Sequence, residues 1–143
     1  MYKWLVFSIL ALMFMFSYFV RLSTGVLGPE LMEDLQMNAS QLGALGAAFF
    51  YAFAIVQIPV GLALDFMNPK RVIISTTFLA AIGCLLFSIA ESFQIALVGR
   101  ILIGLGMSAV YMGSLKIFNN WFRPDEFGFL SGLMLSIGNI GAL

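Results

Sequence analysis

The chain has 143 residues, of which 62% are hydrophobic and 10% charged, and its formal net charge at pH 7 is zero. A soluble domain is near half apolar and a quarter charged, so this composition predicts an all-α integral membrane protein and gives no basic footprint for nucleic acid. With no His, a single Cys in an apolar run and no Gly-rich phosphate loop, the sequence predicts no metal site, no disulfide, no cofactor and no enzyme.

The first apolar segment predicts a transmembrane helix over about residues 4–28, long enough to cross about 30 Å of hydrocarbon. A secretory signal peptide is the alternative, because Lys3 suits its basic start. No small-x-small cleavage site follows, however, and Arg21 would be out of place in such a peptide. An acidic loop without a basic residue is expected next, over residues 29–41.

A second span is predicted over about residues 41–64, with Asn38 or Ser40 as its N-terminal cap. The span is rich in small residues, and Gly43 and Gly46 lie three positions apart. Membrane helices approach one another closely where such residues share a face, so we expect another backbone to pack here.

A short polar hinge, residues 61–71, joins this span to a third one at about residues 72–90 and requires a tight antiparallel hairpin. Lys70 and Arg71 open the third span, and such a basic pair marks the hinge as cytoplasmic. Asp65 lies at the C-terminal end of the second span, where its charge opposes the helix dipole, so a nearby cation is expected. The third span has only weakly polar side chains and is expected to be peripheral or lipid-facing.

The fourth span is predicted over about residues 95–118. Arg100 and Lys116 are sixteen residues apart, which is about 160° around a helix, so they cannot line one face. Tyr111 is eleven residues from Arg100 and shares a face with it and with Gly104.

A fifth span is predicted to begin near Gly128 and to be incomplete at Leu143, because sixteen residues rise only about 24 Å. Basic residues at the span ends fall on one side, and the outer loops are acidic, so we expect a multi-pass protein with a cytoplasmic N-terminus. The sequence shows no targeting tail or loop insertion, which favours a bacterial inner membrane. The basic residues of the inner side are Lys3, Lys70, Arg71 and Arg123.

The hinge resembles the loop between the second and third helices of the major facilitator superfamily. The shared pattern is Gly61-x-x-x-Asp65 followed by the basic pair Lys70-Arg71. Phe66 replaces the arginine that usually follows the aspartate, and an Asn-Pro pair replaces the glycine before the basic pair. The resemblance implies that these residues gate the protein, by contacts between its two halves, rather than bind solute.

The fourth span carries a second match, because Arg100-x-x-x-Gly104-x-Gly106 resembles a motif on the fourth helix of the same superfamily. The two matches occur in the right order and topology. They imply a bundle of two six-helix halves, of which residues 1–143 supply the first four transmembrane helices and part of the fifth. The missing second half is then a partner, in the same chain or separate. The resemblance and the spacing together suggest a structural or proton-coupling role for Arg100, Gly104, Gly106 and Tyr111.

Three cations lie within apolar spans, where a charge costs at least about 2.5–3.5 kcal/mol. They are Arg21, Arg100 and Lys116, and no acid lies within the body of any span. Uncompensated cations that line a cavity favour an anionic ligand. Lys116 is near the inner end of its span, so its amine either faces a cavity or extends to the cytoplasmic surface.

Arg21 is the strongest candidate ligand, since it lies about 27 Å along a helix from Lys3 and its guanidinium suits two-point binding of a carboxylate or phosphate. Tyr18-Phe-Val-Arg21 resembles the first helix of the organophosphate and organic-anion symporters of the superfamily, in which this arginine binds the substrate. Outward extension of Arg21, or pairing with an acid elsewhere, is the alternative. Tyr18 is grouped with Arg21, whereas Tyr51 and Gln57 are weaker candidates that also suit interhelical packing.

The sequence therefore predicts secondary transport of a small anionic organic solute by alternating access, with a proton or sodium ion as the candidate coupled ion. A dipeptide or amino-acid transporter is one alternative, because the Trp121-Phe122 turn and residues 132–138 resemble the lysosomal dipeptide branch and its bacterial relatives. A non-transporting fragment is another, and the DNA downstream of Leu143 would distinguish it. Besides the solute, the lipid bilayer is the predicted partner.

The predicted topology can be tested with single cysteines and a membrane-impermeant thiol reagent. Cysteines at Asn38 and Ser92 should be labelled from outside sealed cells, because both positions fall in outer loops. A cysteine at Asn68 should not be labelled. Labelling of position 68 from outside would show that the orientation is inverted.

Overall fold

The computed structural model describes residues 2–143, within which every regular element is a helix. The helices in chain order are α1 (Tyr2–Val26), α2 (Gly28–Asp34), α3 (Ala39–Phe66), α4 (Pro69–Ser88), α5 (Phe93–Trp121) and α6 (Pro124–Ile140). Four of them, α1, α3, α4 and α5, are long and apolar enough to cross a membrane. The all-α prediction is confirmed.

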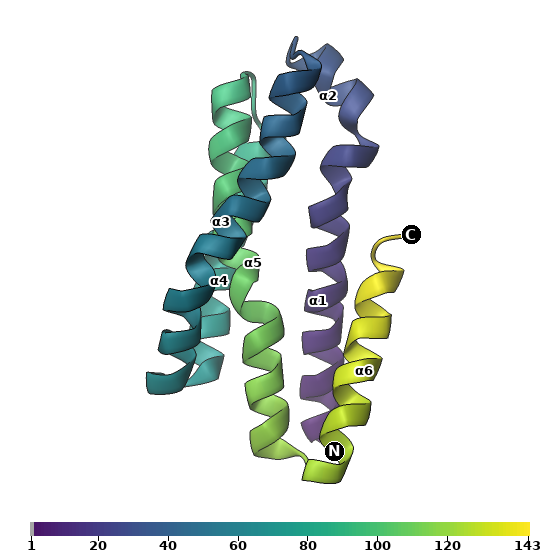
Figure 1. The fold of residues 1–143 in the computed structure, drawn as a ribbon, viewed down its shortest axis with the longest axis vertical. Helices are drawn as coiled ribbons and strands as arrows, with labels where there is room; N and C mark the ends of the chain where they lie inside the picture. The colour runs from purple at the N-terminus through teal and green to yellow at the C-terminus, as the bar shows by residue number, and fades with distance from the viewer. Residues whose placement is uncertain (1) are drawn as a thin grey trace.

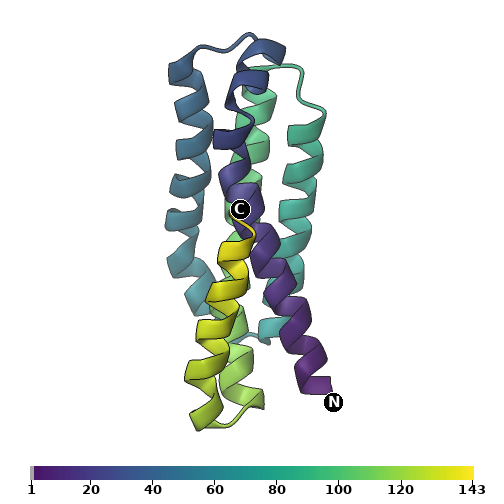
Figure 2. The same ribbon diagram turned by 90° about the vertical axis from the view of Figure 1, so that its right-hand side faces the viewer.

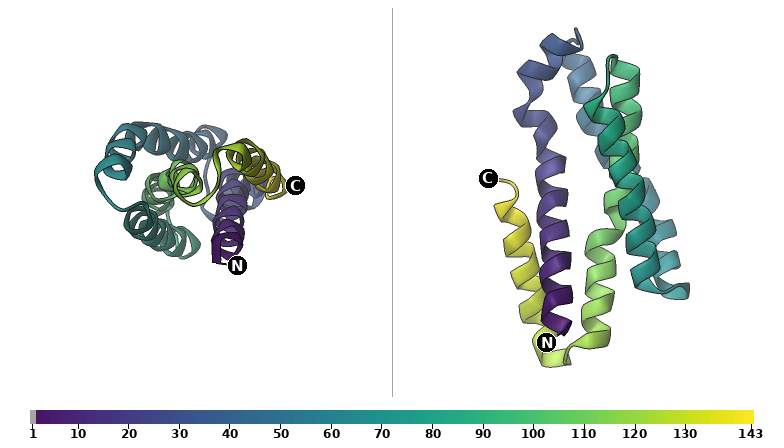
Figure 3. Two further views of the ribbon diagram at one scale, coloured as in Figure 1. Left: turned by 90° about the horizontal axis from the view of Figure 1, so that it is seen from below. Right: turned by 180° about the vertical axis from the view of Figure 1, so that it is seen from behind.

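The long helices run up and down along one axis as an elongated bundle (Figure 1). Helices α3, α4 and α5 form a closely packed group, and α1 with α6 lies against α5 on the other side (Figure 3). The N-terminus, the α3–α4 turn and the α5–α6 turn lie at one end, whereas α2 and the α4–α5 turn lie at the other (Figures 1 and 2). These turns alternate between the two ends as the sequence predicts for successive spans.

Helix starts are fixed by side-chain caps. At α3, the side chain of Asn38 accepts a hydrogen bond from the backbone N–H of Gln41 at 2.9 Å, and the Asn38 N–H donates to Gln41 Oε1 at 3.0 Å. Of the two predicted caps, Asn38 is therefore the one used. At α4, the Asn68 side chain accepts from the Lys70 N–H at 3.0 Å, directly before Pro69 in the first turn. Most of the predicted hinge is therefore helical, and only two residues connect α3 to α4.

Two boundaries differ from the sequence prediction. The acidic segment predicted as a loop contains the short helix α2, whose first turn holds Pro29 and Glu30. Helix α6 begins at Pro124 instead of near Gly128, because proline suits the first turn of a helix and Glu126 accepts a hydrogen bond from the Arg123 N–H at 3.0 Å. Both helix starts are encoded locally by a proline followed by an acidic residue.

Two glycines allow α5 to pack against neighbours on opposite sides. A Cβ at Gly104 would lie 2.5 Å from the carbonyl oxygen of Phe49 on α3, and a Cβ at Gly106 would collide with the backbone of Ala80 on α4. The two positions are about 200° apart around the helix, so α3 and α4 approach different faces of α5. By contrast, a Cβ at Gly43 would meet no atom within 4 Å, and the same holds for Gly46. The predicted packing at these two residues is therefore wrong within residues 2–143.

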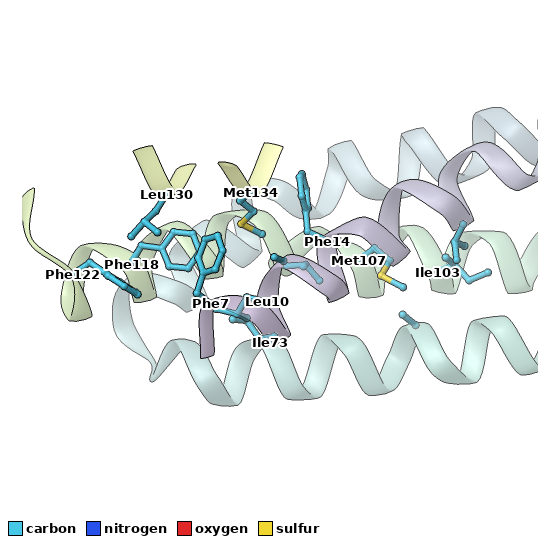
Figure 4. Packing of buried hydrophobic residues seen from close by; sticks show 14 of the residues in the cluster. Phe7, Leu10, Phe14, Ile73, Ile103, Met107, Phe118, Phe122, Leu130 and Met134 are labelled. Carbon is cyan, nitrogen blue, oxygen red and sulfur yellow. The ribbon is translucent and has the colours of Figure 1, made fainter. Parts of the chain in front are cut away.

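The buried core joins α1 and α6 to α5 at the end that carries the N-terminus (Figure 4). The rings of Phe7 and Phe118 have centroids 5.3 Å apart, and Leu130 and Met134 of α6 are almost completely buried beside them. Offset aromatic contacts of this kind add to the burial of apolar area. The core continues along α1 as far as Val20, which is buried in the same cluster as Phe49 of α3 and Ile103 of α5.

Gly106→Ala should destabilise the protein by about 1–3 kcal/mol, because the new methyl group would overpack the α4–α5 contact. Gly132→Ala is the matched control, since no atom lies within 4 Å of a Cβ there and alanine favours the helix. Thermal unfolding of the detergent-purified protein would measure both. A midpoint for Gly106→Ala equal to or above that of the unmodified protein would contradict this close contact.

Candidate functional site

A cavity of about 240 Å³ lies between α1, α3, α5 and α6, and polar side chains from three of these helices converge on it. Tyr18, Arg21 and Gln57, which the sequence predicts as solute ligands, all line this cavity together with Tyr111 of α5. The other lining residues are Phe14, Ser17, Phe53, Met107, Met112 and Leu135. The structure thus brings three of the five predicted solute ligands to one place.

Aromatic rings surround the guanidinium of Arg21. Its Cζ lies 4.9 Å from the ring centroid of Tyr18 and 5.2 Å from that of Phe53, and the rings of Phe49 and Phe50 are each at 5.8 Å. The negative faces of such rings attract a cation and offset part of the cost of its burial. The Nε atom is buried and has no hydrogen-bond partner among the described residues. Arg21 therefore retains both a positive charge and donor capacity.

The three phenylalanines are the part of this site that sequence reasoning missed. From the sequence they are interpreted as core or lipid-facing residues without a binding role, because phenylalanine is abundant throughout the chain. The available signal is their register on α3: Phe49, Phe53 and Gln57 are spaced by four and so share one helix face. That face is directed at Arg21 and the cavity.

No carboxylate neutralises Arg21 within the described part of the chain. The ion pairs found there join Lys3 to Glu126 at 3.7 Å, Lys116 to Asp65 at 2.8 Å and Arg123 to Asp125 at 3.2 Å. Neither Arg21 nor Arg100 belongs to these pairs. For Lys116, the prediction that no carboxylate neutralises it is wrong, because Asp65 at the end of α3 reaches the amine.

The Lys116–Asp65 pair provides the cation predicted near Asp65, and it comes from α5 instead of the neighbouring basic pair. It links the C-terminal end of α3 to α5 and places Lys116 outside the cavity around Arg21. Lys70 and Arg71 are exposed at the start of α4, and a Cβ at Gly61 would meet no atom within 4 Å. The predicted gating residues therefore form a largely open surface at this end of the bundle.

Arg100 is completely buried, and its Nη1 donates a hydrogen bond of 2.8 Å to the carbonyl oxygen of Val20 on α1. Tyr111 stacks on Phe14 of α1 with ring centroids 5.1 Å apart. Arg100 and Tyr111 therefore both face α1, as their spacing predicts, whereas Lys116 contacts α3. Gly104 and Gly106 allow α3 and α4 to pack closely against α5.

Tyr51 does not take part in this arrangement. Its side chain is 70% exposed on α3, and it lines none of the cavities described here. A larger groove of about 610 Å³ lies between α1 and α4, with Lys70 and Thr77 as its polar lining residues. Because its walls are otherwise apolar, it offers few groups that could orient a polar solute. The cavity around Arg21 is the candidate site.

Comparison with known proteins places these features in a family. The model of the Major Facilitator Superfamily matches residues 9–143. A probable sulfoacetate transporter of Cupriavidus necator is 28% identical over 137 residues, which cover 96% of this chain and 32% of that protein. A probable galactarate/D-glucarate transporter of Pseudomonas putida is 26% identical, with 94% and 31% covered.

A hexuronate transporter of Bacillus subtilis is 31% identical over 114 residues, which cover 77% of this chain and 26% of that protein. The chain thus spans about a third of the length of the curated relatives it matches. No solved structure matches it.

Proposed function

Because the chain belongs to the major facilitator superfamily, whose members are membrane transporters and not enzymes, we propose that it forms the first part of a secondary transporter for a small organic anion. The observation that carries the proposal is Arg21, a cation in a cavity with aromatic walls and without a carboxylate partner in residues 2–143. In this role the anion supplies the missing counter-charge. Alternating access then exposes the site to each side of the membrane in turn.

In this proposal the residues that line the cavity bind different parts of the solute. The guanidinium of Arg21 binds the anionic group through two parallel hydrogen bonds. The hydroxyl groups of Tyr18 and Tyr111 and the amide of Gln57 are available for the polar remainder of the solute, and the Gln57 Oε1 is buried without a partner. Met107 and Leu135 close the cavity with apolar surface.

A carboxylate or sulfonate is the proposed anionic group. The relatives described above are named for sulfoacetate, for galactarate and D-glucarate, and for hexuronate, and each of these solutes carries such a group. A dipeptide also carries an ammonium group, which would require an acidic partner. The described cavity has no carboxylate among its lining residues, so the dipeptide alternative lacks a corresponding contact.

The proposed gate lies at the other end of α3. Asp65 and Lys116 tie α3 to α5 there, while Gly61, Lys70 and Arg71 remain open for contacts with a second half of the transporter. The proposal also includes a cytoplasmic location for this end, a bacterial inner membrane and a coupled proton or sodium ion. Asp65 acts in it by changing the populations of the two access states and not by touching solute.

Asp65→Asn should reduce transport by the full-length protein while solute binding stays close to that of the unmodified protein. Lys116→Gln should have the same effect, and exchange of the two charges, Asp65→Lys with Lys116→Asp, should restore part of the transport. Uptake into proteoliposomes and binding in detergent would be measured with sulfoacetate, D-glucarate or glucuronate, whichever the unmodified protein binds best. Normal turnover with weakened binding in Asp65→Asn would contradict the gating role.

Arg21→Lys keeps the positive charge but loses the planar two-point fork, so it should bind an anionic solute roughly ten- to a hundredfold more weakly. Arg21→Ala should lose more. Tyr51→Phe is a matched control, because this exposed tyrosine lies away from the cavity. Calorimetric titration of the purified full-length protein would measure the affinities, with thermal unfolding as the check on folding. Folded Arg21 variants that bind as tightly as the unmodified protein would assign Arg21 a structural role.

A further inference from the structure

Arg100 is the buried charge that the proposed function leaves unexplained. Its side chain has no exposed surface, and no ion pair within residues 2–143 includes it. Of its three nitrogens, Nη1 has a hydrogen-bond partner, whereas Nε and Nη2 are buried without one. The rings of Phe87 and Phe49, at 5.2 and 5.8 Å, offer the guanidinium partial compensation. Burying a cation with so few hydrogen-bond partners costs folding free energy, and an apolar side chain at this position would cost less.

The hydrogen bond of Arg100 reaches the peptide group that leads into Arg21. Its acceptor is the carbonyl oxygen of Val20, which also accepts a hydrogen bond from the Ser23 hydroxyl at 2.8 Å. The contact joins residues eighty positions apart and fixes the height and rotation of this turn of α1 against α5. Any movement of that turn moves the base of the Arg21 side chain.

A second connection runs through the ring of Phe49. The guanidinium carbons of Arg21 and Arg100 each lie 5.8 Å from its centroid, so the two arginines share one aromatic ring. Phe49 is itself almost completely buried, and Gly104 allows its backbone to approach α5 closely. Arg100 therefore touches both the backbone and the aromatic wall that orient Arg21.

The turn that carries Arg21 lies between two cavities. The solute cavity lies on one side of it, and on the other a second cavity of about 420 Å³ opens between α1 and α3, with Gly43 and Gly46 in its wall. Val20, the residue before Arg21, is buried in the same core cluster as Phe49 of α3 and Met107 of α5, so the backbone of this turn is anchored while the Arg21 side chain faces the cavities. Among the described residues, Arg100 lines neither cavity, so it is placed to hold this turn without reaching the solute.

We propose that Arg100 is a positioning residue that sets the orientation of Arg21 through the Val20 carbonyl and the Phe49 ring; the inference rests on the proposed role of Arg21 as the anion ligand. Arg100 uses one donor toward a single acceptor, whereas Arg21 presents two donors to a two-oxygen anion. The two arginines therefore differ in what can replace them. Lysine keeps the charge and can donate to a single acceptor, but it lacks the planar pair of donors, so it serves at position 100 and fails at position 21.

The test compares anion binding by full-length protein carrying Arg100→Lys or Arg100→Gln, with sulfoacetate and D-glucarate as probes. Arg100→Lys should bind close to normally, and Arg100→Gln should bind about tenfold more weakly. In an Arg21→Lys background, Arg100→Gln should have little further effect, because the group that it positions is already altered. Arg123→Gln is the control, since it removes a cation from an exposed turn that lines neither cavity beside Arg21.

A second measurement needs no solute. Phenylglyoxal modifies accessible guanidinium groups, and mass spectrometry would follow its rate at Arg21 in each variant. Arg100→Gln should raise this rate by freeing the Arg21 side chain, whereas Arg100→Lys and Arg123→Gln should leave it unchanged. Because the rate does not depend on anion binding, it still decides the role of Arg100 if neither probe binds.

Three results would overturn the positioning role. They are equal losses from Arg100→Gln in both backgrounds, a folded Arg100→Lys variant that binds as poorly as Arg21→Lys, and an unchanged phenylglyoxal rate at Arg21 in Arg100→Gln. If Arg100→Gln does not fold, comparing anion binding by Arg100→Lys with binding by Arg21→Lys still decides whether Arg100 is a positioning residue. Normal binding by Arg21→Lys is a different outcome, since it removes the proposed function and leaves the Arg100 contact as a purely structural one.

Discussion

The structure depends on how two guanidinium charges are accommodated in an apolar bundle that provides no carboxylate for them within residues 2–143. The cost of an unpaired charge at membrane depth is several kcal/mol or more, and it must be offset by local groups or by a ligand. Arg100 is offset by a backbone carbonyl and two aromatic rings in a closed environment. Arg21 has aromatic rings and an open cavity, so an anionic ligand can complete its environment.

Helix packing determines which charge is closed in and which remains accessible. Gly104 and Gly106 allow α3 and α4 to approach α5 closely, and this contact surrounds Arg100 on α5 with packed side chains. On α1, Val20 is buried in the core, whereas the neighbouring Arg21 lines two cavities. Arg100 is therefore enclosed by packed side chains and lines neither of these cavities, whereas Arg21 lines both. This difference is the physical basis for assigning the two arginines different roles.

The general architecture could be predicted from the sequence, because an uninterrupted apolar run of about 20 residues in a membrane almost always forms a spanning helix. The cavity grouping of Tyr18, Arg21 and Gln57 was partly accessible, since an isolated charge in an apolar span identifies a candidate by itself. The aromatic surroundings of Arg21 and the identity of the cation beside Asp65 were not, because each contact joins helices whose relative rotation no single helix encodes. Gly43 and Gly46 show the same limit, since a small-residue face permits close packing without specifying the partner.

Recognition of charge by Arg21 is the central claim, and a pair of nearly isosteric solutes tests it most directly. Glucuronate and glucuronamide differ at one position, where a carboxylate is replaced by a neutral amide. If Arg21 binds the anionic group, full-length protein should bind glucuronate and not glucuronamide, and Arg21→Ala should remove this preference. Equal binding of the two solutes, or a preference for glucuronate that persists in a folded Arg21→Ala variant, would contradict anion recognition by Arg21.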